Sequence, residues 1–396
     1  MTQIAILERK CTRCGLCAQA CPFGGVDLLM DGRPVLNAAC RVCGACVRAC
    51  PQGAILRLET RAQSVDKSLW RDILVYAEVS GGRLHPVALE LIGKALELAA
   101  PLGYAVRVVM VGSDLEPFAR ELLHYGPAEV AVYDNPALAG FRADAYAACV
   151  EDYIRAIRPC VVLVGATSLG RSLAPRLATR FRTGLTADCT RLLLRDNSDL
   201  VQIRPAFGGN IMAQIVTTHT RPQFATVRYK VMDAPPRLET CGGAIVHRDI
   251  PAAAAASRAI CLRSELLPPK RGISEAEILV VGGRGLRREA DLNLIRALAG
   301  ALGGDWAVTR PLVEKGWATN DRQIGLSGRT VRPKLIITCG VSGAIQFTSC
   351  MRASERIVAI NTDPSAPIFD VAHIAVTGDL YQIVPRLTGL VKEAKA

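Results

Sequence analysis

The stretch ILVVGGRGLRREADLNLIRALAGAL, residues 278–302, has the pattern of a buried strand, a glycine-rich turn and a helix. Such a unit brings backbone N–H groups and a helix N-terminus to one place, where a phosphate group can bind. The turn is neither G-x-G-x-x-G nor a Walker A sequence, and a tight βα turn that needs glycine for backbone freedom explains it equally well. A second strand, loop and helix, LIITCGVSGAIQFTSCM, follows at residues 335–351. Two such loops in one sheet predict a dinucleotide crevice.

Outward from this stretch, short apolar strands alternate with helical patterns over most of the chain, beginning near residue 71. Strands separated by roughly 10–15 helical residues predict right-handed βαβ units and parallel sheets. The predicted strands are residues 73–79, 105–112, 128–134, 160–168, 278–286, 334–340, 356–363 and 373–379, and the predicted helices include residues 87–103 and 145–159.

A cysteine pattern occurs twice at the start of the chain, as KCTRCGLCAQACPFG at residues 10–24 and ACRVCGACVRACPQG at residues 39–53. Each copy is C-x2-C-x2-C-x3-C-P, the bacterial ferredoxin run in which the fourth cysteine ligates the other cluster. A zinc site has no use for a Cys-Pro pair repeated in register. The pattern therefore predicts two 4Fe-4S clusters that carry single electrons and have no open iron site. The predicted ligands are Cys11, Cys14, Cys17 and Cys50 for one cluster, and Cys40, Cys43, Cys46 and Cys21 for the other.

Two changes of composition divide the chain into three parts. Residues 60–72, TRAQSVDKSLWRD, are polar and lack a helical or strand period, and we interpret them as a linker. Residues 250–277 replace the strand pattern with alanine, proline and basic residues. We therefore predict a small α+β ferredoxin-like domain with two 4Fe-4S clusters over residues 1–60, a Rossmann-like parallel-sheet α/β domain over 71–260, and a doubly wound α/β domain over 272–396.

Composition narrows the functional classes. Half of the 396 residues are hydrophobic, which is ample for buried cores. No apolar run approaches the ~18 residues of a membrane span, and the N-terminus lacks a signal-peptide pattern, so a cytoplasmic protein without membrane insertion is expected. The net charge of +12 is spread along the chain without a basic stripe interleaved with aromatic residues, which argues against a nucleic-acid partner.

The remaining polar and sulfur-containing side chains give no sign of another catalytic centre. The sequence lacks G-x-S-x-G, H-E-x-x-H and paired-carboxylate constellations, so hydrolytic chemistry is not expected. The five histidines show no metal spacing: His85, His124, His219, His247 and His373. Seven scattered cysteines are expected to be small buried hydrophobic residues: Cys149, Cys160, Cys189, Cys241, Cys261, Cys339 and Cys350.

Ordered motifs in both α/β parts resemble the α subunit of electron-transfer flavoproteins, over about residues 71 to 393. They are GLTADCT and RPAFGGNIMAQIVTTHTRPQFATVR in the middle part, and GGRGL, WATNDRQIGLSGRTVRP, GVSGAIQF and AINTDPSAPIFDVAHIAVTGDLYQIVP in the last part. Chains of this family with a two-cluster module at the N-terminus resemble those of electron-bifurcating complexes of anaerobes. The resemblance implies a heterodimer with a β subunit, in which the last domain of this chain carries most of the FAD site.

The resemblance also implies roles for individual residues of the last domain. Arg284 would lie against the flavin ring, where a fixed cation favours anionic reduced forms. Gln323 and Ser327 would face the ring system, with the Ser327 hydroxyl near N5. The ribityl chain and pyrophosphate would be wrapped by Ser342, Gly343, Ala344, Ile345 and Gln346, and the adenosine end would be held by Asn361 and Asp379.

Three positions depart from the family pattern. Phe347 replaces a histidine expected near the flavin N1 and C2 carbonyl, and Leu326-Ser327 replaces the usual Gln-Thr. These changes remove polar support for negative charge on the flavin. We therefore predict that a one-electron-reduced, anionic flavin is less stable than is usual in the family, while FAD binding itself is retained.

The middle domain contains a further strand, loop and helix, GATSLGRSLAPRLATRFRTGLTADCT, at residues 165–190. By its pattern alone this segment could form another nucleotide site. In the family this domain chiefly builds the scaffold against the partner, and the nicotinamide or AMP site belongs to the β subunit. We therefore interpret Arg171, Arg176 and Thr186 as packing and interface residues.

The resemblance and the cysteine pattern together imply an electron relay. The partners would be a β subunit that takes hydride from NADH, a flavin-dependent dehydrogenase of the acyl-CoA or 2-hydroxy acid type, and ferredoxin, and the relay would serve flavin-based electron bifurcation. Two alternatives stay open: a non-bifurcating conduit to a membrane quinone reductase, and a self-sufficient iron-sulfur flavoenzyme with its own substrate pocket. No catalytic residue is predicted, because no acid/base residues converge on the flavin motifs.

Overall fold

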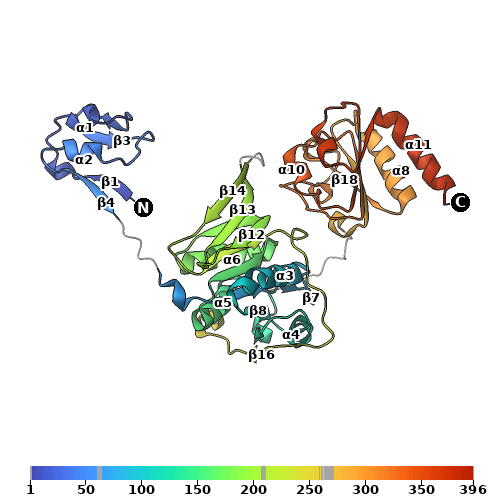
Figure 1. Cartoon of the computed structure of the whole chain (residues 1–396), viewed down its shortest axis with the longest axis horizontal. Coiled ribbons are helices and arrows are strands. Elements are labelled where there is room, and N and C mark those ends of the chain that lie inside the picture. The colour runs from blue at the N-terminus through green and yellow to red at the C-terminus, as the bar shows by residue number, and fades with distance from the viewer. Residues whose placement is uncertain are drawn as a thin grey trace. The chain divides into compact units, whose positions relative to one another are not determined.

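The computed structural model describes residues 2–59, 65–206, 211–257, 259, 262 and 272–395. They form two compact units that meet between Val65 and Asp66 (Figure 1). The segment 60–72, which was expected to be a linker, is therefore partly structured. Asp66 caps a 3-10 turn, Lys67–Leu69, and the Lys67 ammonium lies 2.8 Å from the Asp199 carboxylate, so these residues belong to the second unit. Residues 60–64 lie outside the described part of the chain.

The first unit is an internal repeat, and it confirms the predicted small α+β fold. Its elements are β1 (Thr2–Ile6), α1 (Leu16–Gln19), β2 (Val26–Leu28), β3 (Pro34–Leu36), α2 (Ala45–Ala49) and β4 (Ile55–Glu59), with β1 antiparallel to β4 and β2 antiparallel to β3. The repeat extends to the backbone angles. Gly15 and Gly44, which precede the two helices, have φ of 74° and 78°, and Arg13 and Val42 have φ of 59° and 54°. The two cysteine loops thus share one unusual backbone path.

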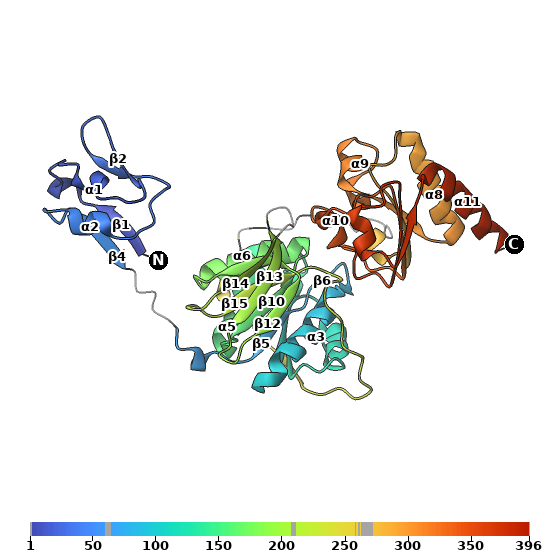
Figure 2. The same cartoon turned by 45° about the horizontal axis from the view of Figure 1, so that its top comes forward.

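The middle α/β domain is built on a seven-stranded, wholly parallel sheet in the order β11-β15-β10-β5-β8-β9-β16. Figure 2 shows α3 and α6 on either side of these strands. The strands are β5 (Ile73–Tyr76), β8 (Val106–Gly112), β9 (Glu129–Asp134), β10 (Val161–Gly165), β11 (Leu185–Cys189), β15 (Gln223–Val227) and β16 (Ala244–His247). One face is covered by α3 (Val87–Ala99) and α4 (Glu116–Leu123), and the other by α5 (Ala143–Ile157), α6 (Ser168–Arg180) and α7 (Ala252–Ala255).

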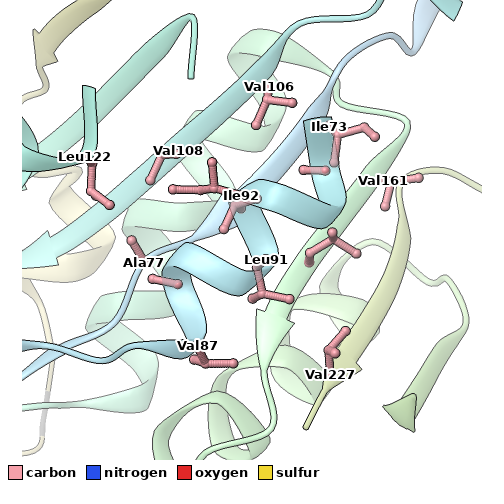
Figure 3. Close-up of a cluster of buried hydrophobic side chains, with 14 of the residues drawn as sticks. Ile73, Ala77, Val87, Leu91, Ile92, Val106, Val108, Leu122, Val161 and Val227 are labelled. Carbon is pink, nitrogen blue, oxygen red and sulfur yellow. The ribbon is translucent and has the colours of Figure 1, made fainter. Parts of the chain in front are cut away.

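Two hydrophobic cores, one on each face of the sheet, explain why its strands are continuous apolar runs. Along β5, Ile73 faces the core beneath α3, whereas Leu74 faces the core beneath α5 and α6. Leu91 and Ile92 of α3 pack toward the strands in Figure 3, and neither side chain is exposed. Burial on both faces removes the alternation of polar and apolar residues that a half-exposed strand would show.

A three-stranded antiparallel sheet lies between β11 and β15 in the sequence, and its strands were not predicted. Its strands are β12 (Arg191–Leu194), β13 (Leu200–Ala206) and β14 (Ile211–Val216), with β13 in the centre. The edge strand β14 exposes apolar side chains such as Ile211 and Met212, so it shows neither a clean alternation nor a buried run. A small antiparallel hairpin, β6 (Val79–Ser80) and β7 (Arg83–Leu84), follows β5.

Glu90 of α3 is a buried carboxylate in the middle domain, 8% exposed. Its two oxygens accept the Lys230 backbone N–H, at 3.0 and 2.9 Å. Burial raises the pKa of Glu90 to about 7, while backbone hydrogen bonds from the segment after β15 act in the opposite direction. A carboxylate whose pKa is raised in the folded state binds a proton there that the unfolded chain has released, so stability falls as pH rises from the ordinary pKa to the raised one.

We therefore expect the free energy of unfolding to fall between about pH 4.5 and about pH 7, and the variant Glu90→Gln to lose most of this fall. The measurement is the urea midpoint of the purified complex across that range. Glu97→Gln is the matched control, because Glu97 lies on the same helix with its side chain 66% exposed. An identical pH dependence in wild type and Glu90→Gln would contradict the expectation.

The last domain is built on a five-stranded parallel sheet in the order β18-β17-β19-β20-β21, and it confirms the predicted doubly wound fold. The strands are β17 (Ile278–Gly282), β18 (Asp305–Val308), β19 (Leu335–Cys339), β20 (Arg356–Asn361) and β21 (Ile374–Thr377). Figure 1 shows α8 (Leu292–Leu302) and α11 (Leu380–Glu393) side by side on one face. On the other face lies the single turn α10 (Ile345–Thr348). The chain winds from β17 outward to β18 and then back past β17 to β19, so the order reverses between β17 and β19.

All eight strands predicted from the apolar runs are present within a few residues of their expected ends. Among the residues that the structure describes, no helix combines the length and the apolar character that crossing a membrane requires.

Candidate cofactor sites

Two cavities open along the carboxyl ends of the strands of the last sheet, where the strand order reverses. The first measures about 500 Å³ and the second about 340 Å³, and both are lined by Arg284 and Ser342. Arg284 follows β17 and Ser342 follows β19, the two strands that flank the reversal. Open α/β sheets bind their ligands in this crevice, outside the carboxyl ends of the strands at the switch point.

Most of the residues expected at the FAD site line these two cavities. Gly343 and Ile345 do not, and they line a third cavity together with Lys230 and Cys350. The first cavity includes Arg284, Gln323, Ser327, Ser342, Ala344, Gln346 and Phe347, and the second includes Asn361 and Asp379. Their assignment to particular parts of FAD remains a prediction.

The two glycine-containing loops that were predicted from sequence cross each other in direct backbone contact. The Gly283 N–H donates to the Cys339 carbonyl at 2.9 Å, and the Gly285 N–H donates to the Gly340 carbonyl at 2.9 Å. A Cβ atom on Gly283 would lie 2.3 Å from the Gly340 oxygen. Gly283 and Gly285 of the first loop are therefore required by close approach and not by backbone freedom, whereas Gly340 and Gly343 of the second loop, at φ 64° and 88°, need that freedom.

The start of α8 does not offer the phosphate site that the strand–turn–helix pattern allowed. The helix begins only at Leu292, well past the end of β17 at Gly282. The Asp291 carboxylate already lies at this helix N-terminus, where it accepts the Arg288 N–H at 3.0 Å and the Tyr381 hydroxyl at 2.6 Å. A carboxylate stabilised by the helix dipole leaves no place there for a phosphate. The loop itself, and not the helix, lines the two cavities.

Hydrogen bonds fix the loop that faces the first cavity. Gln323 is 3% exposed, and its side-chain amide donates to the Ser327 hydroxyl at 2.8 Å. The Leu326 N–H donates to the Gln346 carbonyl at 3.1 Å, which ties this loop to α10. Phe347 is 5% exposed and, with Leu326, forms an apolar part of the wall. The loop thus offers a held amide and hydroxyl beside an apolar surface.

Arg284 offers both cavities a cation without an ion pair among the described residues. Its side chain is exposed and has no hydrogen bond or ion pair with the residues that the structure describes. An unpaired guanidinium, two backbones brought together by glycine and an apolar wall are suited to a ligand with a phosphate group and a flat ring system. The residues present therefore fit FAD.

Asn361 and Asp379 shape the second cavity by local hydrogen bonds. The Asn361 amide donates to the Val341 carbonyl at 2.8 Å, and its carbonyl oxygen accepts the Asp363 N–H at 3.0 Å. One Asp379 oxygen accepts the Tyr381 N–H at 2.9 Å and caps α11. These bonds account for both side chains without a ligand, although both line the cavity.

Sequence reasoning missed several lining residues. Thr309 and Arg310 enter the first cavity directly after β18, and Arg287 and Tyr381 line the second, with the Arg287 guanidinium 4.9 Å from the Tyr381 ring centroid. Position at a strand end was the available signal for Thr309 and Arg310, since the residues that follow neighbouring parallel strands meet at one edge.

The cysteines of the first unit are gathered as the predicted pairing requires for one cluster. Cys11, Cys14, Cys17 and Cys50 line one cavity. In the other group, burial raises the pKa of the Cys46 thiol, and the nearby Cys40 and Cys21 raise it further.

The fourth cysteine of each copy has the same backbone partner. The Gly25 N–H donates to the Cys21 sulfur at 3.1 Å, and the Ala54 N–H donates to the Cys50 sulfur at 3.3 Å. Among the described residues, no group of three or more His, Cys, Asp or Glu side chains is arranged to hold a single metal ion.

The scattered cysteines are mostly buried, as expected. Cys241 is exposed, so the expectation is wrong for this residue, and Cys261 lies outside the described residues. Burial raises the pKa of the other thiols above the usual range, which keeps them protonated and unreactive. They are Cys149, Cys160, Cys189, Cys339 and Cys350.

The first turn of α6 packs closely against the end of β10 in the middle domain. A Cβ on Gly170 would lie 1.9 Å from the Gly165 oxygen, so the turn is closed on itself. Thr186 is 3% exposed within β11, Arg171 pairs with Asp188 at 2.9 Å, and Arg176 is exposed. Packing accounts for Thr186, and an interface role for the two arginines stays a prediction.

Family comparisons agree with the three parts of the chain. Residues 10–55 match the 4Fe-4S dicluster domain, residues 73–253 the electron transfer flavoprotein domain, and residues 272–352 the electron transfer flavoprotein FAD-binding domain. The chain is 50% identical to the lactate dehydrogenase (NAD(+),ferredoxin) subunit LctC of Acetobacterium woodii, covering 95% of this chain and 90% of that protein. It is 42% identical to the electron transfer flavoprotein subunit alpha of Thermoanaerobacterium thermosaccharolyticum, over 82% of this chain and 99% of that one. It is 39% identical to protein FixB of Rhizobium meliloti, over 81% and 92%.

The three family models match successive segments of the chain, and two relatives align with more than four fifths of it. The chain belongs to the family of electron transfer flavoprotein α subunits and carries an N-terminal 4Fe-4S dicluster domain.

Proposed function

We propose that this chain binds one FAD and two 4Fe-4S clusters and relays electrons between a β subunit on the NADH side, a flavin-dependent dehydrogenase and ferredoxin, in flavin-based electron bifurcation. One observation supports the proposal most strongly: a single chain contains both a possible FAD site and a possible cluster site. The first is the crevice at the switch point of the last sheet, in a domain that matches an FAD-binding family, and the second is the N-terminal unit with its eight cysteines. When bound, a flavin exchanges electrons singly or in pairs, and the clusters exchange them singly.

The side chains of the crevice have separate tasks in this proposal. Arg284 supplies a fixed positive charge that both cavities share, so it attracts the anionic cofactor and favours its reduced, more negative state. The Gln323 amide orients the Ser327 hydroxyl toward the ring system. Phe347 and Leu326 exclude water from the ring but donate no hydrogen bond, which leaves Arg284 as the main support for negative charge.

In the first unit the chain supplies eight thiolates in two sets. Cys11, Cys14 and Cys17 with Cys50 hold one cluster, and the copy from residue 40 with Cys21 holds the other. The N–H groups of Gly25 and Ala54 donate to the fourth sulfur of each copy. Such bonds to cluster sulfurs tune the reduction potential, and their equivalence predicts similar tuning in both halves.

The dehydrogenase partner is proposed to be of the 2-hydroxy acid type. The relative with 50% identity over nearly the whole chain is named as a subunit of a lactate dehydrogenase that uses NAD(+) and ferredoxin. The acyl-CoA type is the other class that the sequence left open. The described lining of the first cavity, where the ring system is proposed to lie, carries two arginines, amides and hydroxyls but no carboxylate, histidine, lysine or cysteine that could act as an acid or base on a substrate.

The experiment is anaerobic co-expression with the β subunit and with the dehydrogenase, followed by determination of iron and FAD. About eight iron atoms per α chain are expected, together with at least one FAD in addition to the flavin of the dehydrogenase. The complex is then given lactate or an acyl-CoA with NAD(+), with and without reduced ferredoxin. NADH formation from lactate that requires reduced ferredoxin supports the proposal. Turnover of a substrate by the α chain alone would favour a self-sufficient enzyme, and electron delivery to a quinone reductase without NADH or ferredoxin would favour a conduit.

A further inference from the structure

An arginine-lined cavity of about 460 Å³ lies at the amino edge of the seven-stranded sheet. This edge is opposite to the carboxyl edge at which such sheets usually bind ligands. Five arginines and two aromatic side chains line the cavity. None of them is among the residues assigned to FAD or to the clusters.

The sheet topology brings these side chains together. The strands β11, β15, β10 and β5 are neighbours and parallel, so all four begin at this edge. The segment that enters each strand contributes a lining residue: Trp70 before β5, Arg158 before β10, Arg182 before β11 and Arg221 before β15. Residues that are far apart in sequence thus form one concave surface.

Arg221 is held rigidly in the wall of this cavity and is 3% exposed. Its guanidinium donates to the Asp199 carboxylate at 2.7 Å, the Ser198 carbonyl at 3.2 Å and the Thr220 carbonyl at 3.0 Å. The Nε–H of Arg221 meets no acceptor among the described residues. The side chain of Arg221 has no exposed surface and its charge is paired with Asp199, so Arg221 fixes the strand entries that form the wall and leaves anion binding to its exposed neighbours.

Arg158 and Arg182 have left-handed backbone conformations, with φ of 47° and 49°. Arg158 directly follows α5, and Arg182 follows the end of α6, positions at which glycine is favoured. Neither side chain has an ion pair or hydrogen bond with the residues that the structure describes. Two arginines in glycine-type positions, with their guanidinium groups on one cavity, indicate a role for the side chains and not for the backbone.

The other two arginines have an ordinary explanation. Arg155 and Arg180 lie in the last turns of α5 and α6, where a cation offsets the helix dipole, and both form ion pairs with Glu151. This explanation does not reach the remaining three arginines. Among the residues that the structure describes, only two carboxylates, Glu151 and Asp199, pair with the five guanidinium groups, so positive charge is in excess at the cavity.

We propose that this cavity binds a phosphate-bearing ligand, held by the exposed guanidinium groups of Arg158 and Arg182. A planar guanidinium donates two parallel N–H groups to phosphate oxygens, and two of them on one cavity match a phosphate or pyrophosphate. The phosphate comes either from the free ion or from a nucleotide, for which Trp70 offers a flat apolar surface. The site is independent of the proposed electron relay.

The test uses the cofactor-loaded complex of the α and β subunits and isothermal titration with inorganic phosphate, pyrophosphate and AMP in a phosphate-free buffer. The variants are Arg158→Gly, Arg182→Gly and their combination. Glycine is better suited than arginine to a left-handed backbone, so these variants are expected to melt at or above the wild-type temperature. Each substitution is expected to weaken pyrophosphate binding by about tenfold or more, because it removes a hydrogen bond to a charged group. Arg120→Ala is the control, since it removes the same charge from a side chain that is 74% exposed on α4.

Binding that is lost in the glycine variants, kept in Arg120→Ala and weakened by salt would support the site. Tighter binding of AMP than of pyrophosphate would identify a nucleotide as the source of the phosphate, and tighter binding of pyrophosphate would identify the free ion. Binding that differs between wild type and the glycine variants belongs to this site and not to other nucleotide sites in the complex. Absence of binding in the wild type, or equal binding in the double variant, would overturn the proposal. Binding of acidic protein alone would overturn it as well.

Discussion

The double variant Cys14→Ala/Cys50→Ala is expected to retain about four iron atoms per α chain, as many as either single variant. The reason is that Cys50, although it belongs to the second cysteine copy, lines the same cavity as Cys11, Cys14 and Cys17. If two residues serve one cluster, the second substitution removes nothing further, and the two effects are not additive. By contrast, Cys14→Ala/Cys43→Ala removes one ligand from each predicted set and is expected to lose nearly all of the iron.

Iron analysis of the anaerobically purified complex, with electron paramagnetic resonance of the reduced clusters, measures this difference. Cys241→Ala is the control, because Cys241 is exposed and lies outside both cysteine copies. The buried core of the first unit is small and consists of Cys17, Val26, Ala54, Ile55 and Cys46, so the single variants are also expected to unfold at lower temperature. Complete loss of iron in Cys14→Ala/Cys50→Ala, with about half retained in Cys14→Ala/Cys43→Ala, would contradict the pairing across copies.

Replacement of Gly283 by alanine is expected to weaken FAD binding by roughly tenfold or more. The added Cβ would lie 2.3 Å from the Gly340 oxygen and 2.7 Å from its carbonyl carbon, so the two loops that form the crevice must separate. Overpacking of this kind costs about 1–3 kcal/mol, and about 1.4 kcal/mol corresponds to tenfold in affinity. Flavin titration of the deflavinated complex, followed by fluorescence quenching, gives the dissociation constant.

Gly300→Ala provides the matched control for this prediction. Gly300 lies in α8 of the same domain, and a Cβ there would meet no atom within 4 Å. Alanine is the better helix residue by about 0.5–1 kcal/mol, so this variant is expected to be slightly more stable and to bind FAD normally. Unchanged FAD affinity in Gly283→Ala would show that the crossing of the two loops does not shape the flavin site.

The apolar runs and the cysteine spacing sufficed to predict the parallel sheets and the repeated first unit. Strands buried on both faces, such as β5, are short uninterrupted apolar runs, and a helical pattern between them fixes their parallel direction. The strands β12 to β14 were not predicted. In β14 the apolar residues Ile211 and Met212 are exposed, so the apolar positions in its sequence do not mark buried positions in the fold.

The residues that line the flavin crevice could be predicted mainly from the family motifs. The physical reason why each of them is needed there became clear only from the fold. Gly283 illustrates this, because a glycine required by the approach of another loop cannot be distinguished in sequence from one required by a turn. A phosphate at the start of α8 stayed open at the level of sequence, since nothing there showed that the Asp291 carboxylate would occupy this position. The arginine cavity at the amino edge depends on four strand entries that only the topology brings together.

The most direct test of the electron relay is an anaerobic titration of the complex with NADH, following the flavin and cluster spectra. It is done with and without ferredoxin, and with and without the oxidised substrate of the dehydrogenase. If the complex bifurcates electrons, NADH is expected to reduce ferredoxin only when the oxidised substrate, which is the high-potential electron acceptor, is also present. Reduction of the flavin by the dehydrogenase but never by NADH would contradict it and would identify a simple conduit.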